Sequence, residues 1–167
     1  DQSFHACYSA VRKRYRYRLW TERYPSPFWR RYTYHVWRPL DLDRLQQAAR
    51  LLEGRHDFAS FRAAGSDTEG TVRTLFRAEV RRDGPFVDLI FEADGFLYKM
   101  VRIMVGTLLT VAAGRRPVEW VAEVLEARDR TRAGDTAPPW GLRLERVYYP
   151  GEELAGGPAG LGRSQPV

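Results

Sequence analysis

The sequence predicts an α+β fold in which a mostly antiparallel sheet carries helices packed on one face. Residues 13–20 and 71–82 alternate between two kinds of side chain with a period of two, which indicates strands. A turn sequence at 83–85 joins the second of these segments to residues 86–93 and predicts an antiparallel hairpin. Residues 96–114 are apolar on almost every side, which predicts a long buried helix.

Residues 13–20 (KRYRYRLW) form the first predicted strand. Successive side chains of a strand point to opposite faces, so this segment has an aromatic face and a cationic face. We expect the aromatic face to join the core. It comprises Tyr15, Tyr17 and Leu19, whereas Arg14, Arg16, Arg18 and Trp20 occupy the other face.

Three prolines within 25–39 indicate a loop or a broken edge strand. A helix is predicted over 41–54, with Asp41 as its N-cap and Gly54 at its end. Its apolar stripe comprises Leu42, Leu45, Ala49 and Leu52. A short strand at 57–61 and a polar loop at 63–70 are expected to follow.

The strand at 71–82 should turn its apolar side chains inward, namely Val72, Thr74, Phe76, Ala78 and Val80. Pro117 is the expected first residue of another helix, and residues 141–149 alternate as a closing strand. The Gly- and Pro-rich residues 151–167 predict a disordered tail. The rest of the sequence, residues 1–150, is predicted to form one domain.

Composition excludes several classes of protein. The 167 residues are 44% apolar and 13% aromatic, which excludes a disordered chain. Three histidines and one cysteine exclude a disulfide scaffold and a Cys/His zinc cluster. No apolar run is long enough to span a bilayer, and the first residues are not a secretory signal. We therefore expect a cytoplasmic protein without a metal and without a membrane partner.

The net charge of +6 comes from an excess of arginine, because all 27 basic residues are arginine except Lys13 and Lys99. Residues 12–38 contain nine basic and nine aromatic side chains but only one acid, Glu22. Guanidinium groups bind phosphate and aromatic rings stack on unpaired bases, so this mixture is typical of a site for single-stranded or looped RNA. The cationic face of 13–20 is accordingly the expected RNA side, with Arg14 and Arg16 as candidate contacts.

Arg102 is the residue most at odds with its surroundings, since it lies in the middle of the apolar segment 96–114. A guanidinium in apolar surroundings needs an anionic partner or access to water. Arg102 could extend to water or pair with a structural acid such as Asp94. Alternatively, it holds a carboxylate or a phosphate at a functional site beside the helix.

Four runs occur together in an order that resembles the bacterial tRNA pseudouridine synthase A family. They are FHACYSAVRKRYRY near the start, DFASFRA at 57–63, GFLYKMVRIMVG at 95–106 and RAGDTAPPWGLRLERVYYP at 132–150. The resemblance covers nearly all of 4–150. It implies a pseudouridine synthase-like fold and the isomerisation of uridine to pseudouridine at positions 38 to 40, in the anticodon stem-loop of tRNA. It also implies a homodimer and no cofactor or metal.

In this family an aspartate acts as the nucleophile on a uridine that has been flipped out of the stack. The resemblance implies that Tyr15 stacks on the flipped pyrimidine and that Arg102 pairs with the nucleophilic aspartate. These two residues are therefore the candidate catalytic residues. Lys99, in the third run, joins Arg14 and Arg16 as a candidate RNA contact.

The sequence departs from the family pattern at the nucleophile. The family's aspartate lies in a Gly-Arg-Thr-Asp-Ala-Gly run upstream of the Phe-His segment, and no aspartate here has that context. We therefore expect 1–150 to be the C-terminal part of the catalytic domain and to be inactive alone. Cys7 stands where the family usually has arginine, which would remove one RNA contact.

Two other interpretations remain open. A non-catalytic basic RNA-binding module would bind RNA without converting it. A structural domain whose arginine content reflects only a GC-rich genome would show no RNA affinity above background. Arg102 favours the enzyme, because a simple RNA binder has no need of an arginine inside an apolar helix.

Overall fold

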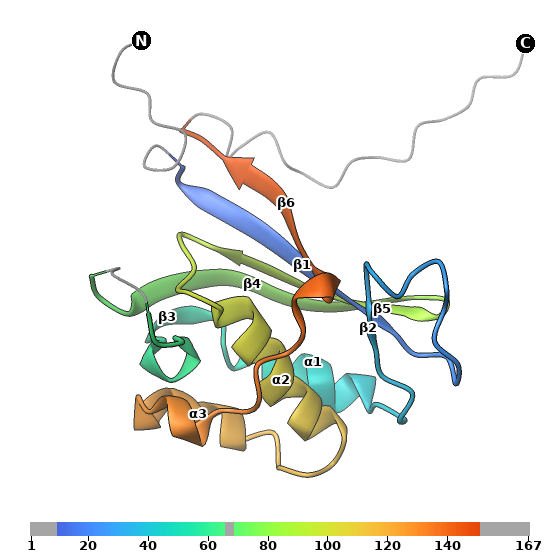
Figure 1. Ribbon diagram of the computed structural model, residues 1–167. Coiled ribbons are helices and arrows are strands. Elements are labelled where there is room, and N and C mark those ends of the chain that lie inside the picture. The colour runs from blue at the N-terminus through green and yellow to red at the C-terminus, as the bar shows by residue number, and fades with distance from the viewer. Residues whose placement is uncertain (1–9, 66–68, 151–167) are drawn as a thin grey trace, which may run out of the picture.

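One six-stranded sheet organises the structure, a computed structural model that describes residues 10–65 and 69–150 (Figure 1). The strand order is β2-β1-β5-β4-β3, and β6 also pairs with β1. The strands are β1 (Arg12–Trp20), β2 (Tyr34–His35), β3 (Gly54–Asp57), β4 (Val72–Asp83), β5 (Phe86–Ala93) and β6 (Leu142–Tyr148). Cys7 and the predicted tail at 151–167 lie outside the described residues.

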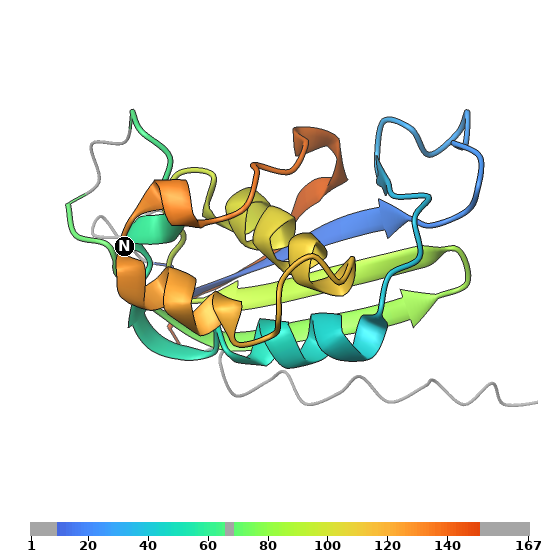
Figure 2. The same ribbon diagram turned by 90° about the horizontal axis from the view of Figure 1, so that it is seen from below.

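The helices α1 (Leu42–Arg50), α2 (Met100–Ala112) and α3 (Trp120–Ala127) lie on the same face of the sheet (Figure 2). All strand pairs are antiparallel except β1 with β2, which pair in parallel over two residues. The predicted α+β class, with a mostly antiparallel sheet and helices on one face, is therefore confirmed. None of the helices in the described ranges is long and apolar enough to cross a membrane.

Local signals set the first helix and the hairpin. The Asp41 carboxylate accepts a hydrogen bond from the Arg44 backbone N–H at 3.0 Å, as an N-cap residue should. The buried stripe of α1 includes Leu45 and Ala49, as expected. The β4–β5 hairpin turns at Gly84, whose φ of +55° suits glycine. The N-cap, the buried stripe and the hairpin are thus confirmed, but the predicted end of the helix at Gly54 is wrong, because α1 ends at Arg50 and Gly54 begins β3.

The predicted strand at 57–61 is wrong, because β3 ends at Asp57 and Ala59–Phe61 form a turn of 3-10 helix. Both Phe58 and Phe61 are fully buried, and a spacing of three suits a helical turn better than a strand. The Ser60 hydroxyl fixes this turn by donating to the Val124 carbonyl at 2.5 Å.

The inward face predicted for β4 is wrong in its first half. Val72 and Phe76 are exposed, whereas Leu75 is buried together with Ala78. The pairing of β4 with β5 shifts between Leu75 and Arg77, which marks a bulge at Phe76. A bulge inserts one residue and reverses which side chains face the core, so a strict alternation could not describe this strand.

Both C-terminal helices begin later than predicted. α2 starts at Met100 rather than at 96, because Lys99 has a left-handed backbone with φ of 58°. A turn over 96–99 precedes it and contributes to the site described below. α3 starts at Trp120, after Pro117 and the turn that follows it.

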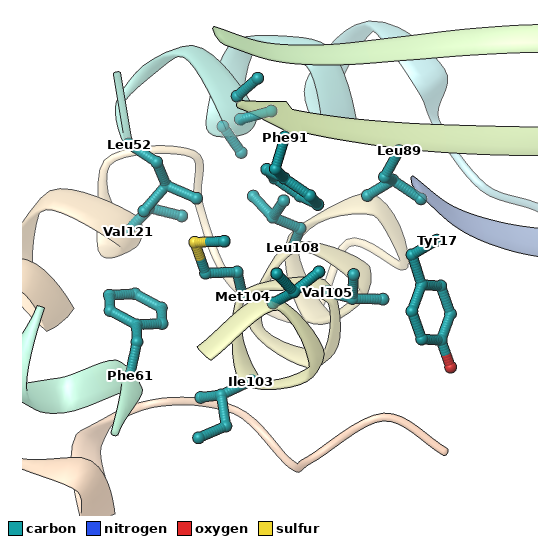
Figure 3. Close-up of a cluster of buried hydrophobic side chains, with 14 of the residues drawn as sticks. Tyr17, Leu52, Phe61, Leu89, Phe91, Ile103, Met104, Val105, Leu108 and Val121 are labelled. Carbon is teal, nitrogen blue, oxygen red and sulfur yellow. The ribbon is translucent and has the colours of Figure 1, made fainter. Parts of the chain in front are cut away.

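The core lies between the sheet and the helices (Figure 3). From the sheet come Tyr17, Leu89 and Phe91, which are fully or almost fully buried. Met104 and Leu108 of α2 oppose them with no exposed surface. The expected inward face of β1 is thus confirmed, and it fixes where Tyr15, two residues before Tyr17, can point.

Candidate functional site

A pocket of about 420 Å³ lies between β1 and the start of α2. Its volume is within the range of about 300–1,000 Å³ that is usual for small-ligand sites. Tyr15 belongs to its wall on the β1 side, and the turn before α2 supplies most of the rest. The lining residues are Tyr15, Gly65, Phe96, Leu97, Tyr98, Lys99, Met100, Val101 and Leu142.

The Tyr15 ring packs against a second aromatic ring and lies on a strand beside a bulge. The Phe96 ring meets it edge to face, with the centroids 5.0 Å apart and an interplanar angle of 84°. The pairing of β1 with β6 shifts between Arg14 and Tyr15, so a bulge lies opposite this ring. Bulges re-aim side chains and are frequent beside active sites. Tyr15 therefore presents a held, half-buried aromatic surface to the pocket.

Lys99 stands at the rim of the same pocket, directly before α2. Its positive φ is uncommon for a residue with a side chain and turns the chain into the helix. The Lys99 ammonium lies 5.0 Å from the centroid of the Tyr98 ring, and both side chains are exposed. The pocket thus combines a cation with aromatic surface.

Arg102 is half-buried in the first turns of α2. Its Nε–H donates to the Ala137 carbonyl at 2.6 Å, and the Ala137 N–H donates to the Arg102 carbonyl at 3.0 Å. The suggested pairing with Asp94 is wrong, because the Asp94 carboxylate accepts from the Thr74 N–H instead. Within residues 10–65 and 69–150, Arg102 forms no ion pair, and its two terminal nitrogens have no hydrogen-bond partner.

The loop that fixes Arg102 lies directly on α2. A Cβ at Gly106 would overlap the Asp135 carbonyl oxygen, and one at Gly134 would come within 2.7 Å of the Thr107 backbone. The Gly134 N–H donates to the Thr107 hydroxyl at 3.0 Å. Two glycines therefore let the loop approach the helix closely enough for Ala137 to reach Arg102.

Tyr17 lies beside this loop with its ring in the core. Its hydroxyl donates to the Pro138 carbonyl at 2.7 Å. Burial raises the pKa of Tyr17 well above its usual value, and the nearby charge of Arg102 only partly opposes that rise. The phenol therefore stays neutral and acts as a structural hydrogen-bond donor.

The raised pKa of Tyr17 predicts a loss of stability at high pH. Below about pH 10, the pKa of a free tyrosine, the phenol is protonated in both states and its contribution is complete. Above that pH the unfolded state loses a proton that the folded state keeps. The free energy of unfolding should then fall by about 1.4 kcal/mol per pH unit from this group. Urea unfolding between pH 9 and about 11 should show that Tyr17→Phe removes this part of the slope; equal slopes would contradict the prediction.

The candidate residues divide between the two faces of the sheet. Arg14 and Arg16 alternate along β1 with Tyr15, Tyr17 and Leu19, so they point to the face of the sheet opposite the core. Arg14 binds Glu92 through Nε at 2.9 Å, and Arg16 lies 3.7 Å from Asp88. Both acids are buried although no helix covers this face, because arginine side chains surround them. The structure therefore places Tyr15 and Lys99 in one pocket, Arg102 on α2 outside the lining of that pocket, and Arg14 and Arg16 on the other face of the sheet.

Sequence reasoning did not identify the other walls of the pocket. Phe96 and Tyr98 fall in the segment predicted as a helix over 96–114, whereas they precede α2, which begins after Lys99. Leu142 was expected only as part of a strand, yet it closes the pocket from β6. The two aromatic residues just before an otherwise aliphatic helix were the available signal. No group of three or more potential metal ligands occurs in the described part of the chain.

Comparison with known proteins shows the family to which the chain belongs. A family model described as tRNA pseudouridine synthase matches residues 48–150. A tRNA pseudouridine synthase A from Moorella thermoacetica is 49% identical over 146 residues, which is 87% of this chain and 59% of the relative. Its counterpart from Halalkalibacterium halodurans is 50% identical over 139 residues, which is 83% of this chain and 53% of the relative. The counterpart from Thermoanaerobacter sp. is 43% identical over 149 residues, which is 89% of this chain and 61% of the relative.

The family model and the relatives together place this α+β domain among the pseudouridine synthases. More particularly, the chain belongs to the tRNA pseudouridine synthase family, as its sequence resemblance implied. It spans about six tenths of the length of the first relatives that it matches.

Proposed function

We propose that this chain is the C-terminal part, over residues 1–150, of the catalytic domain of a cytoplasmic tRNA pseudouridine synthase. In this proposal it binds the anticodon stem-loop of tRNA and holds the target uridine for isomerisation to pseudouridine. The observation that carries the proposal is the Tyr15 pocket at the start of α2, the helix that also carries an arginine with uncommitted terminal nitrogens. A homodimer is the proposed assembly.

The pocket supplies what a flipped base needs. The Tyr15 ring offers a π surface, and its contact with Phe96 limits its movement. Lys99 at the rim can attract a phosphate next to the flipped nucleotide. No metal or cofactor takes part in the proposed chemistry.

Arg102 is proposed to orient the nucleophilic aspartate of the family. The Gly-Arg-Thr-Asp-Ala-Gly run that contains this aspartate does not occur in the sequence. A carboxylate binds a guanidinium most strongly when its two oxygens accept hydrogen bonds from two of the guanidinium nitrogens. Because Nε is held by Ala137, the terminal nitrogens are the ones left for such a carboxylate. In the same proposal Arg14 and Arg16 add to RNA binding from the other sheet face through the field of their positive charge.

The first test is a conversion assay with and without a nucleophile. The chain alone, incubated with unmodified tRNA, should form no pseudouridine. A fusion protein, in which the segment of a tRNA pseudouridine synthase A with the Gly-Arg-Thr-Asp-Ala-Gly run precedes this chain, should form it. Conversion by the chain alone, or none by a folded fusion protein, would contradict the proposal.

Tyr15→Ala should weaken binding of an unmodified anticodon stem-loop RNA by the fusion protein. Stacking of a base on an aromatic ring contributes about 1–3 kcal/mol, so the expected loss is about 5-fold to 150-fold. Tyr15→Phe keeps the ring and should bind within about two-fold of the unchanged protein, apart from any hydrogen bond of the hydroxyl. Filter binding across a salt series measures both. Equal affinity of the alanine variant and the unchanged protein would exclude a stacking role for Tyr15.

A further inference from the structure

A second pocket, of about 400 Å³, opens at the edge of β1. Two strands share this edge, since β6 pairs with residues 12–17 of β1 and β2 pairs with residues 19–20. The pocket lies where β6 begins, near Arg18 in the interval between the two pairings. Its walls are Arg16, Arg18, Trp29, Tyr32, Trp140, Gly141, Leu142 and Arg143.

Three large aromatic side chains in this pocket are open to solvent. Trp29 is 40% exposed, Tyr32 66% and Trp140 51%, although burial of such rings is strongly favourable. Exposed aromatic groups in a concave site mark a surface that binds a partner. Because the same pocket contains three arginines, that partner must offer both a flat apolar surface and negative charge.

Trp29 and the backbone on both sides of the pocket are held in place by contacts within the chain. The Trp29 ring packs against Phe86 with centroids 5.1 Å apart. The Thr33 hydroxyl donates to the Trp29 carbonyl at 2.9 Å and so ties the loop to itself. The backbone next to Trp140 packs closely on the core, since a Cβ at Gly141 would come within 2.7 Å of the Tyr17 ring. A site that is already ordered binds its ligand more tightly, because less conformational entropy is lost on binding.

The three guanidinium groups differ in how far they are already paired. Arg18 binds both oxygens of Asp88 at 2.7 Å. Arg16 lies 3.7 Å from Asp88 and 3.5 Å from Glu145. The Arg143 side chain is exposed and forms no hydrogen bond or ion pair with any described residue. The pocket therefore keeps one guanidinium free for an external anion.

We propose that this pocket binds an unpaired nucleotide of the RNA, with the base on Trp140 or Tyr32 and a phosphate on Arg143. The inference rests on the proposed function and adds a second nucleotide site to it. Leu142 lines both this pocket and the Tyr15 pocket, so the two sites are neighbours. One RNA strand that crosses the start of β6 can occupy both.

Charge favours RNA over a second copy of this chain as the occupant. The segment 22–38 carries four arginines and a single acid, and the whole chain has a net charge of +6. A second copy would bring the same positive charge to the patch, whereas a phosphate backbone is complementary to it. Self-association through this pocket is one outcome that the experiment distinguishes.

The experiment measures binding of a labelled, unmodified anticodon stem-loop RNA to the chain and to the fusion protein. Trp140→Ala should weaken binding about 10-fold, within the range for loss of one stacked base. Arg143→Ala should weaken binding. It should also lower the slope of the logarithm of the binding constant against the logarithm of the salt concentration by about one, since one counterion fewer is released. Phe76→Ala is the matched control, because Phe76 is an aromatic residue of β4 that is 44% exposed but lies outside both pockets and outside residues 12–38, so it should leave affinity unchanged.

Unfolding by urea shows whether each variant is folded. If Trp140→Ala does not fold, binding by Arg143→Ala tests the proposed site instead. Unchanged affinity in a folded Trp140→Ala and in Arg143→Ala would overturn the second site. If Tyr15→Ala weakens binding while these two do not, only this inference fails. If the unchanged fusion protein does not bind the RNA, the proposed function itself fails. A change in sedimentation of Trp140→Ala without a change in RNA affinity would overturn the site in favour of a contact between copies.

Discussion

Arg102→Ala in the fusion protein is expected to lower pseudouridine formation at least about 100-fold, the scale of losing one preorganised electrostatic contact in an active site. The bond from Nε–H to the Ala137 carbonyl fixes the plane of the guanidinium. The terminal nitrogens then point to one place, where the nucleophilic carboxylate is proposed to lie. Without them the aspartate loses both its orientation and its positive neighbour. The measurement is the rate of pseudouridine formation at saturating tRNA.

The same substitution should have a small effect on folding. Arg102 gives up one hydrogen bond to a neutral carbonyl, which contributes about 0.5–1.5 kcal/mol. Because the group is half-buried and forms no ion pair with a described acid, no buried charge is left behind. Loss of turnover with nearly unchanged unfolding by urea would therefore separate the chemical role from a structural one.

Two further variants sharpen this test. Arg102→Lys keeps the charge but not the fork or the Nε donor, so it should recover little of the lost rate. Arg115→Ala removes an exposed arginine after the end of α2 and should leave turnover unchanged. Full activity of Arg102→Ala, or full rescue by lysine, would contradict the proposed bidentate contact.

Features set by neighbouring residues were predictable from the sequence. The alternation of β1 identified which side chains join the core, and burial of Tyr17 and Leu19 confirms it. The glycine at position 84 identified the hairpin, because the tight turn needs a left-handed backbone. Asp41 identified the start of α1 by the same kind of local chemistry.

Features that depend on distant partners were not predictable. The bulge at Phe76 appears only when β4 pairs with β5, since the alternation of β4 alone gives no sign of an extra residue. The turn at 59–61 depends on Ser60 reaching Val124, which is 64 residues away. In both cases packing decided between conformations that the local sequence allows.

The candidate site shows the same division. Arg102 stood out in the sequence because a guanidinium conflicts with an apolar helix. Its partner Ala137 did not, because a backbone carbonyl 35 residues away has no signature in composition. The alternation of β1 separated Arg14 and Arg16 from Tyr15, but only the register with β5 shows that Glu92 and Asp88 lie beside them.

Gly106→Ala carries the second large effect, and its sign separates two physical terms. Alanine is favoured over glycine inside a helix by about 1 kcal/mol, so helix propensity alone predicts stabilisation. The new Cβ would overlap the Asp135 carbonyl oxygen, however, and backbone cannot move aside as a flexible side chain can. We expect a net loss of about 2 kcal/mol or more in the free energy of unfolding, as overpacking of a close contact usually causes.

The overlap should also reach the site, because relieving it means lifting the 133–138 loop from α2. That movement would stretch the bond from Gly134 to Thr107 and the pair of bonds between Arg102 and Ala137. The fusion protein with Gly106→Ala should therefore lose turnover beyond its loss of stability when both are measured at a temperature where it is folded. Gly95→Ala is the matched control, since its Cβ would meet only the flexible Arg73 side chain, at 3.2 Å. A Gly106→Ala protein as stable as the original would show that the loop is not packed on the helix as described, and Arg102 would then lose the contact that orients it.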